Sequence, residues 1–218
     1  MAAQLPTAEE GGLRFRILSG SVSLLFRLLA RLPLRVLHAL GVLLGWVVYL
    51  GSATYRHRLH ANLSLAGFID RQVRRGAIAE AGKAILEIPY IWYRPRQHVL
   101  ALIQEVRGAP IEALSRSSGR GVIFLTPHIG CFELLSFWVA RAAPLTVLYR
   151  PPKLQWLRPV MDAGRARDNI RLAPTNLTGV RRMLRALRSN EAIDCFPIRC
   201  QALATALGSS SSAVPRTR

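Results

Sequence analysis

The order of hydrophobic and polar positions divides the chain into a helical first part and an alternating second part. Up to about residue 105, apolar side chains recur at helical spacing. From Gly119 onward, short β-branched and aromatic runs alternate with amphipathic stretches, a pattern that predicts strands and helices in turn. Such alternation is typical of an α/β fold. We expect strands over residues 122–126, 145–149 and 170–173, helices over 132–142, 155–168 and 177–188, and a further strand that begins at Glu191.

Residues 13–51 are predicted to form a membrane-associated helical anchor behind a loose N-terminus of residues 1–12. In the first half of this anchor, Arg27, Arg31 and Arg35 form one row at helical i, i+4 spacing. An arginine near the bilayer centre costs about 2.5–3.5 kcal/mol, whereas each Leu, Ile or Val gains only about 0.3–0.6 kcal/mol. We therefore expect this half to lie in the membrane interface with its arginines toward the headgroups.

The second half of the anchor, residues 36–50, is apolar apart from His38. With its flanks it reaches the low limit of about 17 residues for a membrane span, so it is expected to cross the bilayer once or to dip into it. A signal peptide and a buried core helix are the alternatives, although no clean small-x-small cleavage site follows. Both flanks are basic, so the positive-inside rule does not orient this stretch.

Residues 55–105 are predicted to be helical, with one helix beginning at Arg56 and another over residues 78–92. Pro89 and Pro95 are expected to kink or end helices here. Histidines also occur in this region, but no carboxylate or cysteine stands at matching metal-ligand spacing, so we predict no metal site. The histidines concerned are His57, His60 and His98.

The chain of 218 residues carries a formal net charge of +18, almost all of it from arginine. A surface this basic is expected to meet anions, and nucleic acid, anionic lipid and an acidic carrier protein are the candidates. A GC-rich genome, which favours arginine codons, is the alternative cause. Half of the residues are hydrophobic, which excludes a disordered chain. The three cysteines have neither disulfide parity nor metal-ligand spacing, which fits a reducing compartment.

The candidate chemistry lies at the end of the first strand predicted after Gly119. There His128 and Glu133 flank a strand-to-helix turn that begins at Pro127. On one continuous helix, five residues would set the two side chains about 140° apart, whereas across a turn both can face one pocket. Histidine can then act as a general base while the carboxylate fixes its tautomer and stabilises the imidazolium. An ordinary polar turn with an exposed histidine is the alternative.

Further sequence blocks follow this turn in order. They are Val147-Leu148-Tyr149-Arg150-Pro151-Pro152, Gly164-Arg165-Ala166-Arg167 and Leu172-Ala173-Pro174-Thr175-Asn176-Leu177-Thr178-Gly179-Val180. Together with His128–Glu133 they resemble the bacterial lipid A biosynthesis acyltransferases, the lauroyl and myristoyl transferases of lipopolysaccharide assembly, within the lysophospholipid acyltransferase superfamily. The resemblance covers residues 12–193. It implies an acyltransferase-type mixed sheet flanked by helices, in a catalytic domain over residues 55–193 that faces the cytoplasm at the inner membrane.

The same resemblance implies transfer of a fatty acyl chain from acyl carrier protein to a hydroxyl of a lipid A precursor. Neither a metal nor an organic cofactor is required, and no nucleic acid takes part. His128 would deprotonate the acceptor hydroxyl, Glu133 would orient the histidine, and Arg165 would bind phosphate or a developing oxyanion. A solvated arginine on a basic helix is the alternative for Arg165. Further substrate-binding candidates are Arg150, Arg167 and Asn176.

Two other functions stay open at this point. A glycerolipid acyltransferase shares the H-x4-E spacing but usually ends it with aspartate, and the Tyr-Arg-Pro-Pro block argues against it. A non-enzymatic basic protein that binds membranes or nucleic acid would need no His128–Glu133 geometry. A salt-dependent DNA shift assay would separate this last class from the enzymes.

The resemblance stops after Ile193. The family would continue with Leu-Leu-Pro-Asp-Gln-x-Pro, whereas this chain reads Asp-Cys-Phe-Pro-Ile-Arg-Cys-Gln and ends in a serine-rich tail. Allowed codons for residues 193–201, with a single G inserted after the first codon, translate as I-G-L-L-P-D-Q-V-P. We therefore expect a frameshift near Asp194, which would make residues 194–218 a non-native tail and leave the C-terminal part of the fold missing. A naturally short variant is the alternative.

The chain as written is accordingly expected to be inactive and poorly stable. It lacks the aspartate block of the family. Loss of the strand that begins at Glu191 would also leave the neighbouring strand with an unpaired, apolar edge.

Overall fold

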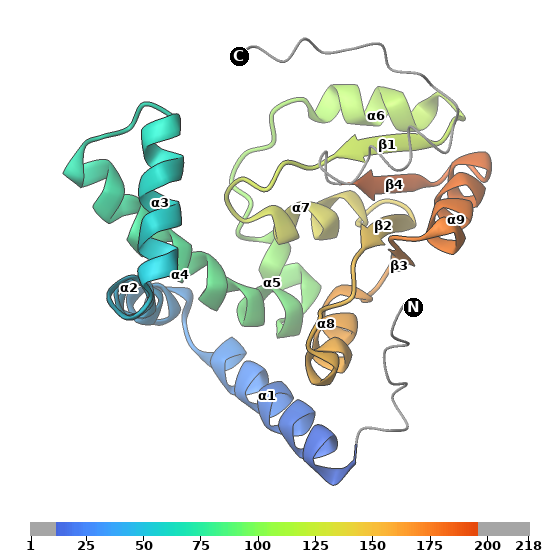
Figure 1. Ribbon diagram of the computed structural model, residues 1–218. Coiled ribbons are helices and arrows are strands. Elements are labelled where there is room, and N and C mark those ends of the chain that lie inside the picture. The colour runs from blue at the N-terminus through green and yellow to red at the C-terminus, as the bar shows by residue number, and fades with distance from the viewer. Residues whose placement is uncertain (1–11, 196–218) are drawn as a thin grey trace. The chain divides into compact units, whose positions relative to one another are not determined.

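The computed structural model describes residues 12–195, which form two compact units that divide between Val99 and Leu100 (Figure 1). The first unit consists of helices, and the second is a parallel sheet with helices around it. This arrangement confirms the predicted α/β class with flanking helices. The start of the predicted loose N-terminus, up to residue 11, and the tail from residue 196 onward lie outside the described residues.

The first unit contains both halves of the predicted anchor as separate helices, with Pro33 between them at the N-cap of the second. Its helices are α1 (Leu13–Arg31), α2 (Leu34–Gly51), α3 (Ala53–Leu65), α4 (Arg71–Tyr93) and the short α5 (Arg96–Leu100). α4 begins well before the predicted start because the Asp70 carboxylate accepts a hydrogen bond from the Gln72 N–H and caps the helix. Pro89 is buried inside α4 without ending it, whereas Pro95 lies just beyond its end.

The end of α4 also holds the corner between α1 and α2. The Arg94 guanidinium donates from Nε to the Ala30 carbonyl oxygen at 2.5 Å and from Nη2 to that of Arg31 at 3.0 Å. A helix end leaves such carbonyl groups without intrahelical partners, so Arg94 caps α1. Phe26 of α1 packs against Trp92 of α4, with ring centroids 6.2 Å apart. Polar and aromatic contacts therefore fix α1 to α4.

The second unit follows the predicted alternation and adds one helix. Its elements are α6 (Ala109–Ser117), β1 (Val122–Leu125), α7 (Phe132–Val139), β2 (Leu145–Tyr149), the 3-10 turn η1 (Gln155–Leu157), α8 (Arg158–Arg165), β3 (Ile170–Pro174), α9 (Leu177–Arg188) and β4 (Ala192–Cys195). Helix α6 is the addition. Its apolar residues Ile111 and Leu114 are exposed, so it has no buried stripe that a hydrophobic pattern could reveal.

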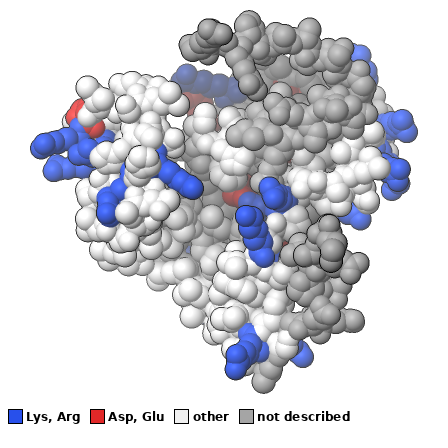
Figure 2. All heavy atoms as spheres, viewed as in Figure 1, with Lys and Arg blue, Asp and Glu red and all other residues white. Residues whose placement is uncertain are grey.

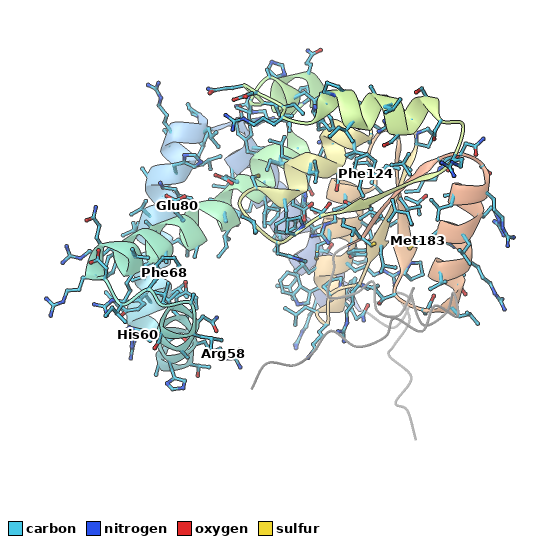
Figure 3. The ribbon with its side chains drawn as sticks, turned by 90° about the horizontal axis from the view of Figure 1, so that it is seen from above. Arg58, His60, Phe68, Glu80, Phe124 and Met183 are labelled. Atoms are coloured by element: carbon cyan, nitrogen blue, oxygen red, sulfur yellow. The ribbon has the colours of Figure 1, made fainter. Side chains whose placement is uncertain are left out.

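The sheet has the strand order β1-β4-β2-β3, and every pairing among these strands is parallel. β4 lies between β1 and β2, with Ala192 in register with Val122 on one side and with Leu145 on the other. Met183 of α9, which Figure 3 labels, is fully buried in a core that includes Ile193. Parallel pairing brings the carboxyl ends of the strands to one edge of the sheet, where binding sites of such folds form.

Strand β4 corrects the expectation that this strand is lost. All of its residues are buried, because β1 and β2 pair with its two sides and Ile193 enters the core. Asp194 and Cys195, which the sequence assigns to a non-native tail, therefore occupy the centre of the sheet.

Candidate functional site

The loop between β1 and α7 carries His128 at the carboxyl edge of the sheet. Thr126 is buried at the end of the strand, and Pro127 follows it. Gly130 adopts a φ of 58°, in the left-handed region that favours glycine, and this bend leads the chain into α7. His128 is exposed, and its ring centroid lies 4.8 Å from that of Phe132. The predicted strand-to-helix turn is thus confirmed.

Glu133 and Arg165 form a two-pronged ion pair between α7 and α8. Arg165 donates from Nε to both Glu133 carboxylate oxygens, at 3.0 and 3.3 Å, and from Nη2 to Oε1. The two side chains are only 11% and 25% exposed, so the pair is shielded from water. Glu133 lies in the first turn of α7 and Arg165 at the last residue of α8, where each helix dipole favours its charge. The arginine therefore fixes the carboxylate in place.

His128, Glu133 and Arg165 line one small cavity. Its volume is about 60 Å³, which suits a reacting group rather than a whole fatty acyl chain. Aromatic and aliphatic side chains form the rest of its wall, together with one hydroxyl. These are Phe132, Ser136, Phe137, Val147, Leu148, Tyr149, Ile170 and Leu172. The tertiary structure thus brings together the catalytic pair and the main substrate-binding residue predicted from the sequence.

Tyr149 is a cavity residue that the sequence analysis quoted only as part of a block. The Arg165 guanidinium lies over its ring, 5.5 Å from the centroid. Its hydroxyl is buried near Asp162, and among the described atoms neither it nor Asp162 Oδ1 has a hydrogen bond of normal geometry. Burial, and then Asp162, raises the pKa of Tyr149 well above its ordinary value. Tyr149 is therefore a neutral, buried wall of the cavity that supports Arg165.

Asp194 is a second residue that the sequence analysis did not assign to the site. Its carboxyl accepts hydrogen bonds from Thr126 Oγ1 at 2.5 Å and from Ser136 Oγ at 3.1 Å. Burial raises the pKa of Asp194, the two hydroxyl groups oppose this effect, and the charge of Glu133 adds to it. Through these two hydrogen bonds, the Asp194 carboxyl group joins β4 to the end of β1 and to α7 beneath the cavity.

The remaining predicted residues lie near the same edge but do not line this cavity. Arg150 is exposed directly after β2, and the Arg167 guanidinium lies 5.6 Å from the Phe137 ring centroid. The Asn176 side chain accepts a hydrogen bond from the Gly179 N–H at 3.0 Å and caps α9, as the sequence predicts. Within residues 12–195, no group of three potential metal ligands is found.

A larger apolar groove, of about 630 Å³, lies between α6, β1 and α7. Its apolar wall is formed by Ile103, Val106, Ile111, Val122, Ile123, Phe124, Leu134, Leu135 and Trp138, and it reaches the His128 loop at Cys131. α7 contributes one set of residues to this groove and a different set to the small cavity. The first turn of α7 therefore stands between the two spaces.

Ion pairs hold α6 over this groove. Glu112 of α6 accepts hydrogen bonds from Arg116 and, at 3.3 Å, from Arg141 Nη2. Arg116 also donates from Nη2 to the Val139 carbonyl oxygen at 2.7 Å, which caps the end of α7. Burial by itself would raise the pKa of Glu112, but the hydrogen bond and charge of Arg116, helped by Arg141, bring it below the ordinary value. Glu112 is therefore ionised and ties α6 to α7.

The comparison with protein families gives one match. The family model described as bacterial lipid A biosynthesis acyltransferase matches residues 16–198, which is most of the chain. The match extends slightly beyond Ile193, where the resemblance of the sequence blocks stops. Among curated proteins, none matches this chain.

Proposed function

Because the chain belongs to the bacterial lipid A biosynthesis acyltransferase family, we propose that it transfers a fatty acyl group from acyl carrier protein to a hydroxyl of a lipid A precursor. The observation that carries this proposal is the shared cavity of His128, Glu133 and Arg165. A base, a carboxylate and a cation in one small space are what acyl transfer to an alcohol requires.

In the proposed reaction, His128 takes the proton of the acceptor hydroxyl as its oxygen attacks the thioester carbonyl. The resulting tetrahedral intermediate carries a negative oxygen, which the Arg165 guanidinium can face. When the intermediate collapses, the C–S bond breaks and the imidazolium returns the proton to the departing carrier thiolate. Glu133 stabilises the imidazolium during this cycle, and Arg165 keeps that carboxylate in place.

The apolar groove between α6, β1 and α7 is proposed to take the acyl chain. Its volume is about ten times that of the cavity, and its wall is largely apolar, as a ligand site for hydrocarbon requires. With the carbonyl group beside His128, the chain would pass the first turn of α7 and enter the groove near Cys131.

The carrier protein is proposed to meet the exposed face of α9. Val180, Met183 and Ala186 of this helix are buried, whereas its opposite side is lined with exposed arginines. These are Arg181, Arg182, Arg185 and Arg188. An acidic partner would be attracted to such a row and held in a defined orientation. The first unit is proposed to keep the enzyme at the cytoplasmic face of the inner membrane.

The test is acylation of a lipid A precursor by a chain whose frame is restored after Ile193, with His128→Ala and Glu133→Ala compared. Each variant is expected to lose at least about 10²-fold in rate, because a positioned base contributes about 10²–10⁴-fold and the two residues act as one unit. His57→Ala, which changes an exposed histidine of α3, is the matched control and should keep full activity. Circular dichroism checks that each variant is folded. Full activity of His128→Ala would show that His128 is not the catalytic base and that the segment is an ordinary polar turn.

A further inference from the structure

Helices α1 and α2 expose rows of large aliphatic side chains. On α2 the row is Val36, Leu40, Leu43, Val47 and Leu50, whose helical spacing places them on one face. On α1 the exposed aliphatic residues are Ile17, Leu18, Leu24, Leu25 and Leu28. An apolar surface of this extent on a soluble protein is unusual and marks an interaction site. In the view of Figure 2, the surface over these helices is mostly uncharged.

The opposite face of α2 is in backbone contact with α4. A Cβ atom on Gly82 would come within 1.9 Å of the Gly41 carbonyl oxygen, so only glycine permits this approach. Nearer the start of α2, His38 Nε2 lies 2.8 Å from Glu87 Oε1. Toward its end, Gly45 lies against the Ile78 backbone. Helix α4 therefore runs antiparallel to α2 along most of its length.

This companion helix carries charges from its first residue to Glu87. Its charged residues are Arg71, Arg74, Arg75, Glu80, Lys83 and Glu87, and Glu80, labelled in Figure 3, pairs with Lys83 at 2.6 Å. The Lys83 backbone lies against Gly41, in the middle of α2. Among the described helices, α2 alone is long and apolar enough to cross a membrane. If it crossed, α4 would enter the bilayer with it and carry Lys83 to the hydrocarbon centre, with Glu80 and Glu87 on either side, which is strongly unfavourable.

We propose that residues 12–99 form a membrane-binding unit that enters one leaflet only. α1 and α2 lie in the plane of the membrane, with their exposed aliphatic rows among the acyl chains, and α4 lies on the water side of α2. Exposed Arg16 and Arg27 of α1 stand beside its aliphatic row, where they can reach anionic headgroups. This inference rests on the membrane attachment in the proposed function and makes it more specific.

Thiol labelling in spheroplasts tests the topology. Gly12→Cys has open space around it and Thr54→Cys is exposed, so the two variants mark the segments before and after α1 and α2. A membrane-impermeant maleimide is added to intact and to permeabilised spheroplasts, and peptide mapping measures each site. Both introduced thiols are expected to stay unlabelled until permeabilisation, with exposed Cys131 as internal reference. Labelling of position 12 alone in intact spheroplasts would show that α2 spans and would overturn the proposal.

Labelling of both positions from outside would support insertion into one leaflet but would refute the cytoplasmic location in the proposed function. The two ideas can therefore fail separately.

Vesicle binding tests whether lipid covers the exposed aliphatic rows of α1 and α2. The full chain and Leu43→Asp are compared on vesicles of phosphatidylethanolamine and phosphatidylglycerol, and the variant is expected to bind at least about tenfold more weakly, because a carboxylate is excluded from the acyl region. Leu114→Asp places the same charge at an exposed leucine of α6 and should bind as the unchanged chain does. If Leu43→Asp keeps full vesicle binding and instead loses a dimer seen by light scattering, the face joins two copies and the proposal fails.

Discussion

At the scale of single residues, Asp194 stands out because its carboxyl group lies in the buried central strand β4 of a parallel sheet. It is 1% exposed, and its described hydrogen-bond partners are the hydroxyl groups of Thr126 and Ser136. A buried carboxylate with neutral partners is unfavourable, so folding raises the pKa of Asp194 and shifts it toward the protonated form relative to the unfolded chain. The nearby charge of Glu133 strengthens that preference.

The raised pKa of Asp194 predicts a stability that falls as pH rises. Below the ordinary pKa of about 3.8, both the folded and the unfolded states are protonated, and ionisation has no effect on stability. Between that value and the higher folded-state pKa, only the unfolded state releases the proton, so each rise in pH favours unfolding. Asp194→Asn should remove this slope and melt at a higher temperature than the unchanged chain at pH 7.

The measurement is thermal unfolding of both proteins across pH 4–8. Glu105→Gln, which changes a well-exposed carboxylate, is the control and should leave the profile as it is. An unchanged slope in Asp194→Asn would show that this carboxyl titrates alike in the folded and unfolded states.

At the scale of elements, the crossing of α2 and α4 depends on glycines. A side chain at Gly82 has no room because the Gly41 carbonyl oxygen and the Gly45 nitrogen lie only 1.9 and 2.6 Å from the position a Cβ would occupy. Backbones this close exclude both water and lipid from the helix pair. The contact is therefore a rigid part of the first unit.

Gly82→Ala is predicted to destabilise the first unit by about 1–3 kcal/mol, the range typical of an overpacked core. Gly76→Ala is the matched control, because it lies in the same helix and its Cβ would meet nothing within 4 Å. That change should stabilise the helix by about 0.5–1 kcal/mol. The measurement is urea unfolding of the full chain, with proteolysis at sites within residues 12–99 as the readout for the first unit. It gives the change in unfolding free energy for each of the two variants. Equal effects of both alanines would contradict the close crossing.

The arginine face of α9 predicts where the carrier protein binds. A double variant with Arg181→Glu and Arg188→Glu should bind acyl carrier protein at least about tenfold more weakly at low salt, because two attractive charges become repulsive. Fluorescence anisotropy of labelled carrier measures this, with Arg120→Glu, an exposed arginine between α6 and β1, as the control. If the control weakens binding equally, net charge rather than α9 attracts the carrier.

At the scale of the whole molecule, the frameshift is the largest prediction. Asp194 is the first residue beyond the expected shift, and the restored frame reads glycine there. Most of the tail concerned, residues 196–218, lies outside the described residues.

Restoring one base near codon 194 is expected to yield a longer chain that melts at a higher temperature and acylates the precursor faster than the 218-residue chain. The DNA across codons 190–200, the melting temperature and the acylation rate are the measurements. A stop codon within a few triplets of the repair, or equal activity of both chains, would refute the frameshift.

The sequence by itself determined the order of strands and helices from Gly119 onward, the turn that holds His128, and the cap at Asn176. These features depend on local pattern: β2 and α9 have the predicted bounds because their hydrophobic spacing and flanking residues agree. The sequence also predicted His128, Glu133 and Arg165 as site residues, but through ordered family blocks rather than through any measure of distance.

Only the tertiary structure decided which groups meet. The Glu133–Arg165 ion pair joins residues far apart in sequence, and no periodicity predicts that contact. The central position of β4, the buried hydrogen bonds of Asp194 and the approach of Gly82 to Gly41 are likewise consequences of packing. The hydrophobic pattern of the sequence indicates which face of each element is buried, whereas the residues that pack against that face depend on how all the elements pack together.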